Sequence, residues 1–371
     1  MGKGKKIWII GIVSVIAVMT VFIVGLLMAD PLNMEEVDQV FSKDKGYNYF
    51  YSKLNEEEQY NYRRLYYSIY MCNEDVMLKD VNIDKATTIY NSILYDHPEF
   101  FHLGLEFEYV EERDNITIYP IYDYQKEEIK QYNEKIKKNS EKIIKEAKSQ
   151  KNDLNKIKTI YDYLIENIEF AYSKNDQNIL SALIDKKTVC AGYARAYQYL
   201  LERVGIECSY IPGKTKIDQN NPQEEGHAWL MIHLNDNYYY SDPTWGDVVD
   251  EGLKHTCYGY FLMNSDEMLQ CYQPDDYYEK SMNNGLDYFK ENRLYMEKYD
   301  KNILSYAIKR AVSNKEHIAE VKCANEQVYN QVKNKLQNSY LGYEVLSQNH
   351  CYKEGSRYYC DDKLKLVELH F

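Results

Sequence analysis

The chain has 371 residues, enough for two or three domains, and its 44% apolar and 28% charged residues exclude a wholly disordered protein. The net charge is −13, and three of the basic residues, Lys3, Lys5 and Lys6, precede the first apolar run. The remaining body is therefore still more acidic, and phosphate backbones would repel it, which excludes nucleic acid as a partner.

The first predicted element is a transmembrane signal anchor at residues 7–29. This run has no charged residue, and as a helix it would span about 34 Å, enough for a hydrocarbon core of ~30 Å. Lysines precede it and acidic residues follow it, so the positive-inside rule predicts a single-pass protein of the cell membrane, with a cytosolic tail (1–6) and an extracellular body (30–371). A cleavable signal peptide is the alternative, and it would place the body in the same compartment.

An N-terminal accessory unit is predicted at residues 30–125. Apolar residues recur at spacings of three and four from residue 34 to about residue 101, which is typical of amphipathic helices. Residues 105–124 largely alternate between apolar and polar, which predicts a hairpin with Asp114-Asn115 at its turn. The lysine-rich segment that follows, residues 126–152, has only a thin apolar stripe and is predicted to be an exposed helical linker.

A central domain is predicted at residues 153–280. Its apolar pattern predicts a helix from about residue 154 to residue 168, a second helix that Thr188 caps and Gly205 ends, and strands at residues 206–210, 228–234 and 238–241. The last two strands form a hairpin. With Asn235-Asp236 as a two-residue turn, Leu234 pairs with Asn237.

A small C-terminal α/β unit is predicted at residues 286–371. Its expected elements are helices at residues 303–312 and 326–336 and strands at residues 319–323, 343–346 and 364–370. Cys351 and Cys360 flank a predicted turn at residues 354–356 and could form a disulfide across a hairpin. Cys208 points into a core and is expected to be a buried free thiol.

Cys190 is the candidate nucleophile. It falls in the first turn of the predicted helix that follows Thr188, where free N–H groups and the helix dipole favour a thiolate. The same N–H groups could stabilise an oxyanion, although the residues indicate no second oxyanion donor. Most cysteines are simply small buried apolar residues, so position alone does not establish catalysis.

His227 and Asp242 complete a candidate triad. His227 begins one strand of the predicted hairpin and Asp242 ends the other, which makes Asp242 the diagonal neighbour of His227 on the same face. His227 would take the thiol proton, and Asp242 would fix the orientation and tautomer of the imidazole. Each of these residues has an ordinary structural explanation by itself. Cys, His and Asp in this order, on a helix and two paired strands, are less often found together by chance.

Three short motifs carry a family resemblance: Thr-Val-Cys-Ala-Gly-Tyr-Ala (188–194), Gly-His-Ala-Trp (226–229) and Asp-Pro-Thr-Trp (242–245). Together they resemble the transglutaminase-like superfamily, in particular the branch of kyphoscoliosis peptidase and bacterial membrane-anchored members. The resemblance implies a papain-like thiol fold with Cys190 as nucleophile, His227 as base and Asp242 as orienting acid. The implied fold class is α+β, with the two accessory units flanking the cysteine domain and one transmembrane helix preceding it.

The predicted function is thioester acyl transfer or hydrolysis on protein or peptide amides, by a membrane-anchored extracellular cysteine acyltransferase or peptidase. The substrate would be a protein or peptide, such as a cell-envelope peptide, and the membrane is a predicted partner through residues 7–29. The alternative is a catalytically inactive surface or cell-envelope binding module that retains the fold.

Other candidate residues receive weaker support. His97 and His102 flank a Pro-Glu-Phe-Phe segment that could touch the active-site cleft or could pack the N-terminal unit onto the central domain. His233 shares the predicted face of His227 and is a possible decoy base. No cofactor or metal is expected, because no Cys-x-x-Cys or His-Glu-x-x-His pair occurs and no acidic cluster resembles the calcium sites of the animal tissue enzymes.

Overall fold

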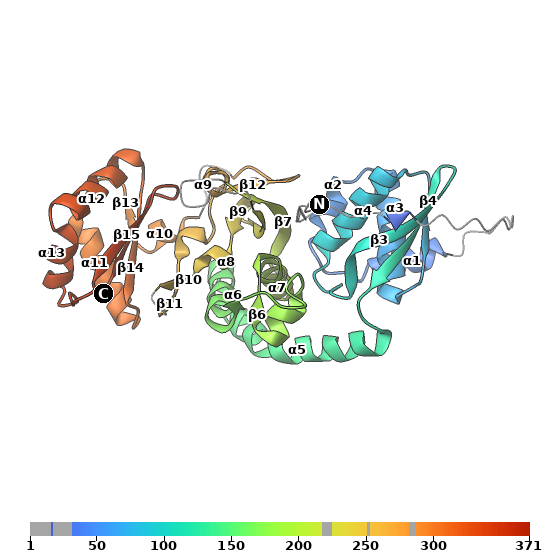
Figure 1. Cartoon of the computed structure of the whole chain (residues 1–371), viewed down its shortest axis with the longest axis horizontal. Coiled ribbons are helices and arrows are strands. Elements are labelled where there is room, and N and C mark those ends of the chain that lie inside the picture. The colour runs from blue at the N-terminus through green and yellow to red at the C-terminus, as the bar shows by residue number, and fades with distance from the viewer. Residues whose placement is uncertain (1–15, 18–31, 217–224, 251–252, 282–285) are drawn as a thin grey trace, which may run out of the picture. The chain divides into compact units, whose positions relative to one another are not determined.

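The computed structural model describes residues 32–216, 225–250, 253–281 and 286–371, together with Ile16 and Ala17 (Figure 1). The chain forms two compact units. The first contains Met1–Pro212 and Gly226–Leu230, and the second contains Gly213–Glu225 and Met231–Phe371. The division between them therefore falls inside two strands, β7 (Glu207–Thr215) and β8 (Gly226–Leu234).

The N-terminal part of the first unit is a helical layer on a sheet, as the spacing of apolar residues predicts for its helices. Its elements are β1 (Ile16–Ala17), α1 (Met34–Phe41), α2 (Tyr49–Lys53), α3 (Glu56–Met71), β2 (Val76–Leu78), α4 (Ile83–Asp96), β3 (Leu103–Glu112) and β4 (Asn115–Tyr122). The strand order in the sheet is β1-β3-β4-β2. Helices α3 and α4 pack against each other and against this sheet.

Local sequence explains why α3 begins where it does and how this part holds together. Asn55 caps α3 by accepting from the Glu58 N–H at 3.0 Å, while Glu58 accepts from the Asn55 N–H at 3.1 Å, a capping box. The apolar stripe of α3, which includes Tyr62, Leu65 and Ile69, is fully buried in the shared core. Burial of this stripe supplies the main stabilisation of the helical layer.

The expected hairpin at residues 105–124 is confirmed, but its turn is one residue earlier than predicted. Strands β3 and β4 leave Arg113 and Asp114 between them, and Arg113 has a positive φ of 56°. Asn115 already pairs with Glu112 in the ladder. The prediction favoured Asp114-Asn115 because both are common turn residues, and the pairing of Ile116 and Ile118 with β2 decided the register instead.

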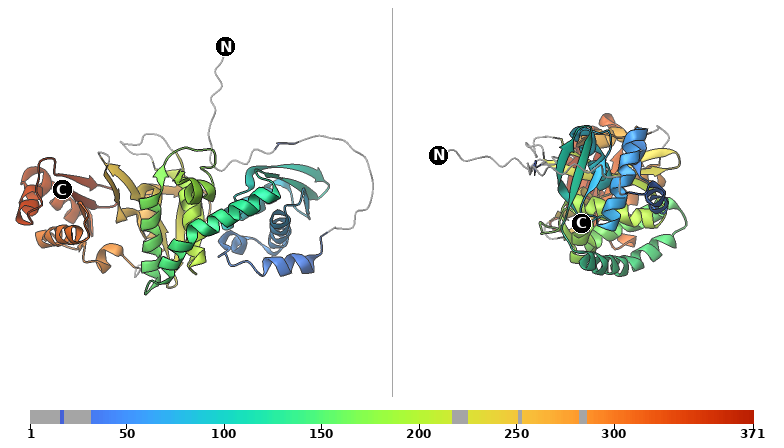
Figure 2. Two further views of the ribbon diagram at one scale, coloured as in Figure 1. Left: turned by 90° about the horizontal axis from the view of Figure 1, so that it is seen from below. Right: turned by 90° about the vertical axis from the view of Figure 1, so that its right-hand side faces the viewer.

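The rest of the first unit leads to the helix that carries Cys190. The elements are α5 (Lys126–Lys148), α6 (Asp153–Asn167), β5 (Glu169–Phe170), the π-helical turn η1 (Ser181–Asp185), β6 (Lys187–Thr188) and α7 (Cys190–Arg203). Helix α5 is the long helix that runs diagonally in the left view of Figure 2, and it packs its thin apolar stripe on α6 and η1. The predicted helices at residues 126–152 and 154–168 are thereby confirmed.

Strands β12 (Tyr272–Pro274), β7, β8 and β9 (Asn237–Ser241) form a second sheet in that order. Asn235 and Asp236 connect β8 to β9, and both have positive φ, 54° and 56°, as a two-residue type I′ turn requires. The rings of His233 and Tyr238 stack at 4.8 Å. These facts confirm the predicted pairing of this hairpin near its turn.

The rest of the second unit is mostly a small α/β module, as predicted. Its elements are α8 (Pro243–Gly246), β10 (Asp247–Asp250), β11 (Leu253–Thr256), η2 (Tyr258–Tyr260), α9 (Ser265–Cys271), α10 (Tyr288–Glu291), β13 (Tyr295–Met296), α11 (Lys301–Ser313), β14 (Ile318–Cys323), α12 (Glu326–Asn338), α13 (Leu341–Gln348), β15 (Arg357–Asp361) and β16 (Leu366–His370). The sheet order is β13-β14-β16-β15, and α11 and α12 pack against β14.

Two predictions for this module are wrong. The strand expected at residues 343–346 lies within α13, because Leu341 and Val345 are one helical turn apart and both are buried. Cys351 and Cys360 are free thiols. The turn at Gly355, which has a φ of +90°, leads into β15, but no strand precedes it, so the hairpin that would bring the two sulfurs together does not form.

The predicted anchor at residues 7–29 lies outside the described residues except for Ile16 and Ala17. These two form strand β1, parallel to Glu108 and Tyr109 of β3, where a helix was predicted. An apolar run rich in β-branched residues suits a strand as well as a helix, which is why its periodicity did not separate the two. Among the helices that the structure describes, none is long and apolar enough to cross a membrane.

Candidate active site

Cys190 is the first residue of α7, and its side chain is about 9% exposed. The N-cap is Val189, not Thr188 as predicted, because the Thr188 hydroxyl is turned toward Ser181 Oγ at 2.6 Å and the Asp176 carbonyl at 3.1 Å. Valine has no side-chain acceptor, so the cap residue leaves the first-turn N–H groups of α7 to a ligand. The predicted position of Cys190 in the first helical turn is confirmed.

Gly192 allows the start of α7 to lie tightly against the preceding loop. A Cβ atom at this position would be 1.8 Å from Thr188 Oγ1 and 2.9 Å from both the Asp176 carbonyl oxygen and Ser181 Oγ. The missing side chain of Gly192 therefore makes room for the hydrogen bond between Thr188 and Ser181.

Helix α7 packs on the sheet through a residue close to Cys190, the candidate nucleophile. Ala194, one turn after Cys190, forms a buried cluster with Tyr210 of β7 and Ala228 of β8. Ala228 follows His227 directly in the chain. This packing brings the backbone at the start of α7 beside the backbone at the start of β8.

His227 is buried, with an exposed fraction of 4%, in β8 of the first unit. Its ring lies 6.1 Å from the ring of Trp229 at an interplanar angle of 24°. Trp229 is fully buried. The alternation of β8 places these two side chains on one face of the strand.

Asp242 lies in the second unit, fully buried immediately after β9. Its Oδ1 caps α8 by accepting from the N–H groups of Thr244 at 2.8 Å and Trp245 at 3.3 Å. Its Oδ2 accepts from the Tyr272 hydroxyl at 2.6 Å. Three donors therefore compensate the burial of the carboxylate and fix its plane.

Tyr272 is the residue of this site that sequence analysis missed. Burial and the Asp242 carboxylate raise the pKa of the Tyr272 phenol well above its usual value, so the hydroxyl stays protonated and donates. The Tyr272 ring also packs at 5.3 Å against the ring of Trp245. Alternation within β12 could not have revealed this role, because the hydrogen bond joins two residues that are 30 positions apart in the chain.

The segment around His97 packs the N-terminal elements onto α7, one of its two predicted roles. Gln198 of α7 donates to the Tyr95 carbonyl at 3.0 Å, and Arg195 donates to the Leu94 carbonyl. A cavity of about 250 Å³ lies beside this contact, with Pro98 and Arg195 among its lining residues.

The other candidate histidines, His97, His102 and His233, make hydrogen-bond or ring-packing contacts with neighbouring side chains. His97 Nε2 lies 2.8 Å from the Tyr62 hydroxyl and Nδ1 lies 3.2 Å from Glu99. The ring of His102 stacks on Tyr122 at 5.8 Å within the N-terminal part. His233 lies near the turn of the β8–β9 hairpin, six residues along the strand from His227, where it stacks on Tyr238.

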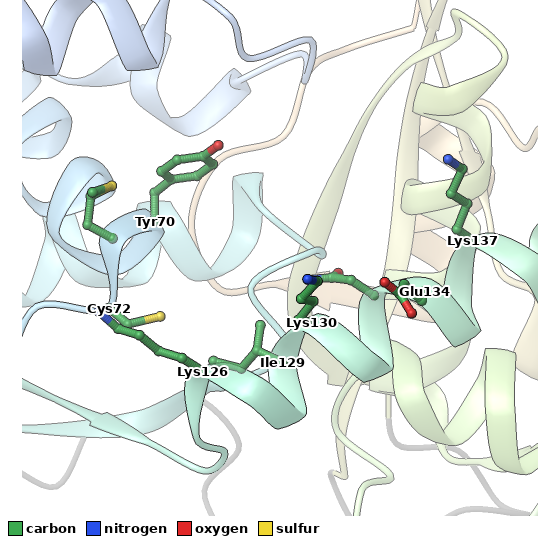
Figure 3. A pocket seen from close by; sticks show the side chains of 9 residues that line it. Tyr70, Cys72, Lys126, Ile129, Lys130, Glu134 and Lys137 are labelled. Carbon is green, nitrogen blue, oxygen red and sulfur yellow. The ribbon is translucent and has the colours of Figure 1, made fainter.

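A larger cavity, of about 460 Å³, lies between the end of α3 and the start of α5 (Figure 3). Its labelled side chains come from α3 or its cap, Tyr70 and Cys72, and from α5, including Lys126 and Glu134. None of the three candidate catalytic residues lines it.

Residues 140–243 match the family model of the transglutaminase-like superfamily. The kyphoscoliosis peptidase of Mus musculus is 28% identical over 115 residues, which are 28% of this chain and 17% of that protein. The human kyphoscoliosis peptidase is 28% identical over 105 residues, or 25% of this chain and 16% of that protein. The chain thus matches less than a fifth of the length of either relative.

Among solved structures, one that matches part of this chain is the periplasmic domain of TgpA from Pseudomonas aeruginosa. It is 13% identical, with a TM-score of 0.24, and the match covers 37% of this chain and 55% of that one. The family assignment rests on the sequence match of residues 140–243, which contains Cys190, His227 and Asp242.

Proposed function

Because residues 140–243 form a transglutaminase-like domain, we propose that the protein is a cysteine acyltransferase or peptidase that uses Cys190, His227 and Asp242. The observation that carries the proposal is the start of α7. It holds a thiol at a helix N-terminus without a capping side chain, and Ala194 of the same helix packs beside Ala228, the neighbour of His227. Such a position favours the thiolate and offers N–H donors to an oxyanion.

The place of Asp242 in the triad is supported by the hairpin register. The ring contact of His233 with Tyr238 and a contact of 3.6 Å from the Tyr240 hydroxyl to Met231 Sδ follow the same pairing. Continued toward the start of β8, the same register would make Asp242 the diagonal neighbour of His227, as the sequence predicts.

The chemistry follows from these roles. The Cys190 thiolate, whose proton His227 has taken, attacks an amide carbonyl, and first-turn N–H groups of α7 stabilise the oxyanion. Collapse of the intermediate breaks the C–N bond, and His227 gives its proton to the leaving amine or ammonia. The resulting thioester is released by an amine, which gives a new amide, or by water, which gives a carboxylate.

The substrate is a protein or peptide amide, and we place the reaction outside the cytosolic membrane. Support for this compartment comes from the uncharged run at residues 7–29 and from the lysines before it. The pairing of Ile16–Ala17 with β3 opposes a membrane-spanning helix, so the topology experiment in the Discussion decides the question.

The test is to incubate the full chain with a glutamine-containing peptide and a biotinylated primary amine, and to analyse both the products and the protein by mass spectrometry. We expect an acyl adduct on Cys190 and loss of all product in Cys190→Ala. Cys208→Ala is the matched control. Burial raises the pKa of the Cys208 thiol well above its usual value, so its removal should leave turnover intact.

The nature of the product separates the two reactions, since cross-linking consumes the amine and hydrolysis does not. Product formation that survives in Cys190→Ala would contradict the proposal. Absence of any adduct in the folded parent chain, across peptides of varied sequence, would favour the binding module that retains the fold.

A further inference from the structure

The C-terminal strand of the second unit carries two potential metal ligands on one face. Glu368 and His370 are two residues apart in β16, so their side chains point the same way. His370 Nε2 lies 2.9 Å from Glu368 Oε2, and His255 Nε2 of β11 lies 3.8 Å from the same oxygen. The two imidazole rings are 5.5 Å apart and nearly perpendicular, at 83°.

A second carboxylate adjoins this group. Glu320 of β14 is directly opposite Glu368 in the antiparallel ladder, and both side chains are largely buried, with exposed fractions of 8% and 13%. The Glu320 carboxylate accepts from the Tyr258 N–H at 3.1 Å, and Cys257 Sγ is within 4.8 Å of a Glu320 and a Glu368 oxygen. Burial of a carboxylate is costly, and a cation at Glu368 would offset that cost.

Two basic residues lie on the strands that pair with β16. Lys322, two residues after Glu320 in β14, forms an ion pair with Glu267 at 2.5 Å. Arg357, opposite His370 in the β15–β16 ladder, has its guanidinium 5.8 Å from the centroid of the Tyr359 ring.

We propose that His255, Glu368 and His370 bind a zinc ion. Two imidazoles and one carboxylate are a common zinc ligand set, whereas calcium and magnesium prefer oxygen ligands alone. Tetrahedral ligands at about 2.0–2.2 Å from zinc stand roughly 3.3 Å apart, and the contacts of 2.9 and 3.8 Å at Glu368 lie on either side of this value. Water takes the fourth position.

The ion would act as a cross-link within the second unit. It would join the β10–β11 hairpin to β16, which are far apart in the sequence. The hairpin follows α8 directly, and the Cys257 N–H donates to the Gly246 carbonyl at the end of α8 at 2.9 Å. Zinc would therefore also steady the helix that Asp242 caps, without entering the proposed reaction.

The test uses the full chain in detergent, with Cys190→Ala to remove zinc binding at the candidate nucleophile. After treatment with a chelator and its removal, zinc chloride is titrated by calorimetry, and thermal unfolding is measured with and without zinc. We expect one equivalent to bind and to raise the Tm. His255→Gln and His370→Gln should each weaken binding by at least ~10-fold and abolish the rise in Tm.

His317→Gln is the matched control, because His317 is an exposed histidine of the same unit, and it should bind zinc like the parent. If circular dichroism shows that a histidine variant does not fold, Glu368→Gln tests the same zinc site, because glutamine keeps the shape of the glutamate side chain. Failure of the parent to bind zinc, or an unchanged affinity in the folded His255, His370 and Glu368 variants, would overturn the proposal.

Discussion

Among single residues, His227 gives the most direct test of whether Cys190 is an activated thiol. We expect His227→Ala to slow alkylation of Cys190 by iodoacetamide near neutral pH, because the thiol loses its base. His233→Ala is the control, since His233 lies on the same strand and stacks on Tyr238. Equal labelling rates at Cys190 in the parent and in His227→Ala would show that the two residues are not coupled.

Tyr272 positions Asp242, and its hydroxyl can be removed without changing the ring. Tyr272→Phe loses the 2.6 Å hydrogen bond to Asp242 Oδ2, which should lower the free energy of unfolding by about 2 kcal/mol and reduce kcat. Tyr260→Phe is a matched control, because the Tyr260 ring also packs edge-on against Trp245, at 5.4 Å, while its hydroxyl donates to Asp361. Chemical denaturation and turnover of both variants check this; equal losses of turnover would contradict the positioning role.

His102 makes the stability of the first unit sensitive to acid. Burial lowers the pKa of His102 from 6.5 to about 4 in the folded protein. Between these values the unfolded chain binds the proton more tightly, so the free energy of unfolding falls as the pH falls from about 7 toward 4. Asp96 acts in the opposite direction, because burial raises its pKa to about 6 and acid then favours the folded state.

A substitution at His102 separates its effect on stability from that of Asp96. His102→Gln should remove a pH-dependent loss of about 2 kcal/mol between pH 7 and pH 5, measured as the difference from the parent in urea unfolding at each pH. The exposed residue His317, changed to Gln, should leave the dependence as it is. An NMR titration midpoint of His102 near 6.5 would refute the prediction.

At the scale of elements, the start of α7 depends on the close approach at Gly192. Gly192→Ala places a methyl group 1.8 Å from Thr188 Oγ1, so either the loop or the helix must shift, which should cost about 3 kcal/mol of unfolding free energy. Gly342→Ala in α13 should instead stabilise by up to about 1 kcal/mol, since its nearest neighbour would be 3.5 Å away. Thermal unfolding of both variants checks that the two changes in stability have opposite signs. An unchanged stability of Gly192→Ala would contradict the close packing at this position.

At the scale of the whole molecule, the arrangement across the membrane is open to a direct test. The uncharged run at residues 7–29 and the preceding lysines predict that residues 30–371 lie outside the cytosolic membrane. Protease added to intact cells or protoplasts should then degrade the body, followed with an antibody against the C-terminal module. Degradation only after lysis would exclude this topology.

The amphipathic helices and the type I′ hairpin could be predicted from the sequence, because each depends on local spacing. The triad of Cys190, His227 and Asp242 stays a prediction. Apolar residues three and four apart specify α3 and α6, and Asn235-Asp236 specifies the turn that sets the register of β8 and β9. The position of Cys190 in the first turn of α7 could be predicted because the sequence indicates where that helix begins.

Only the tertiary structure decided which partners those residues meet. The Thr188 hydroxyl turns from the predicted cap toward Ser181, Tyr272 reaches Asp242 from another strand, and His255 approaches Glu368 from a distant hairpin. The last two contacts join segments far apart in the chain, and burial of polar groups selects all three by requiring that each donor and acceptor find a partner. Sequence spacing carries no record of such pairings, because they arise when sheets and helices pack.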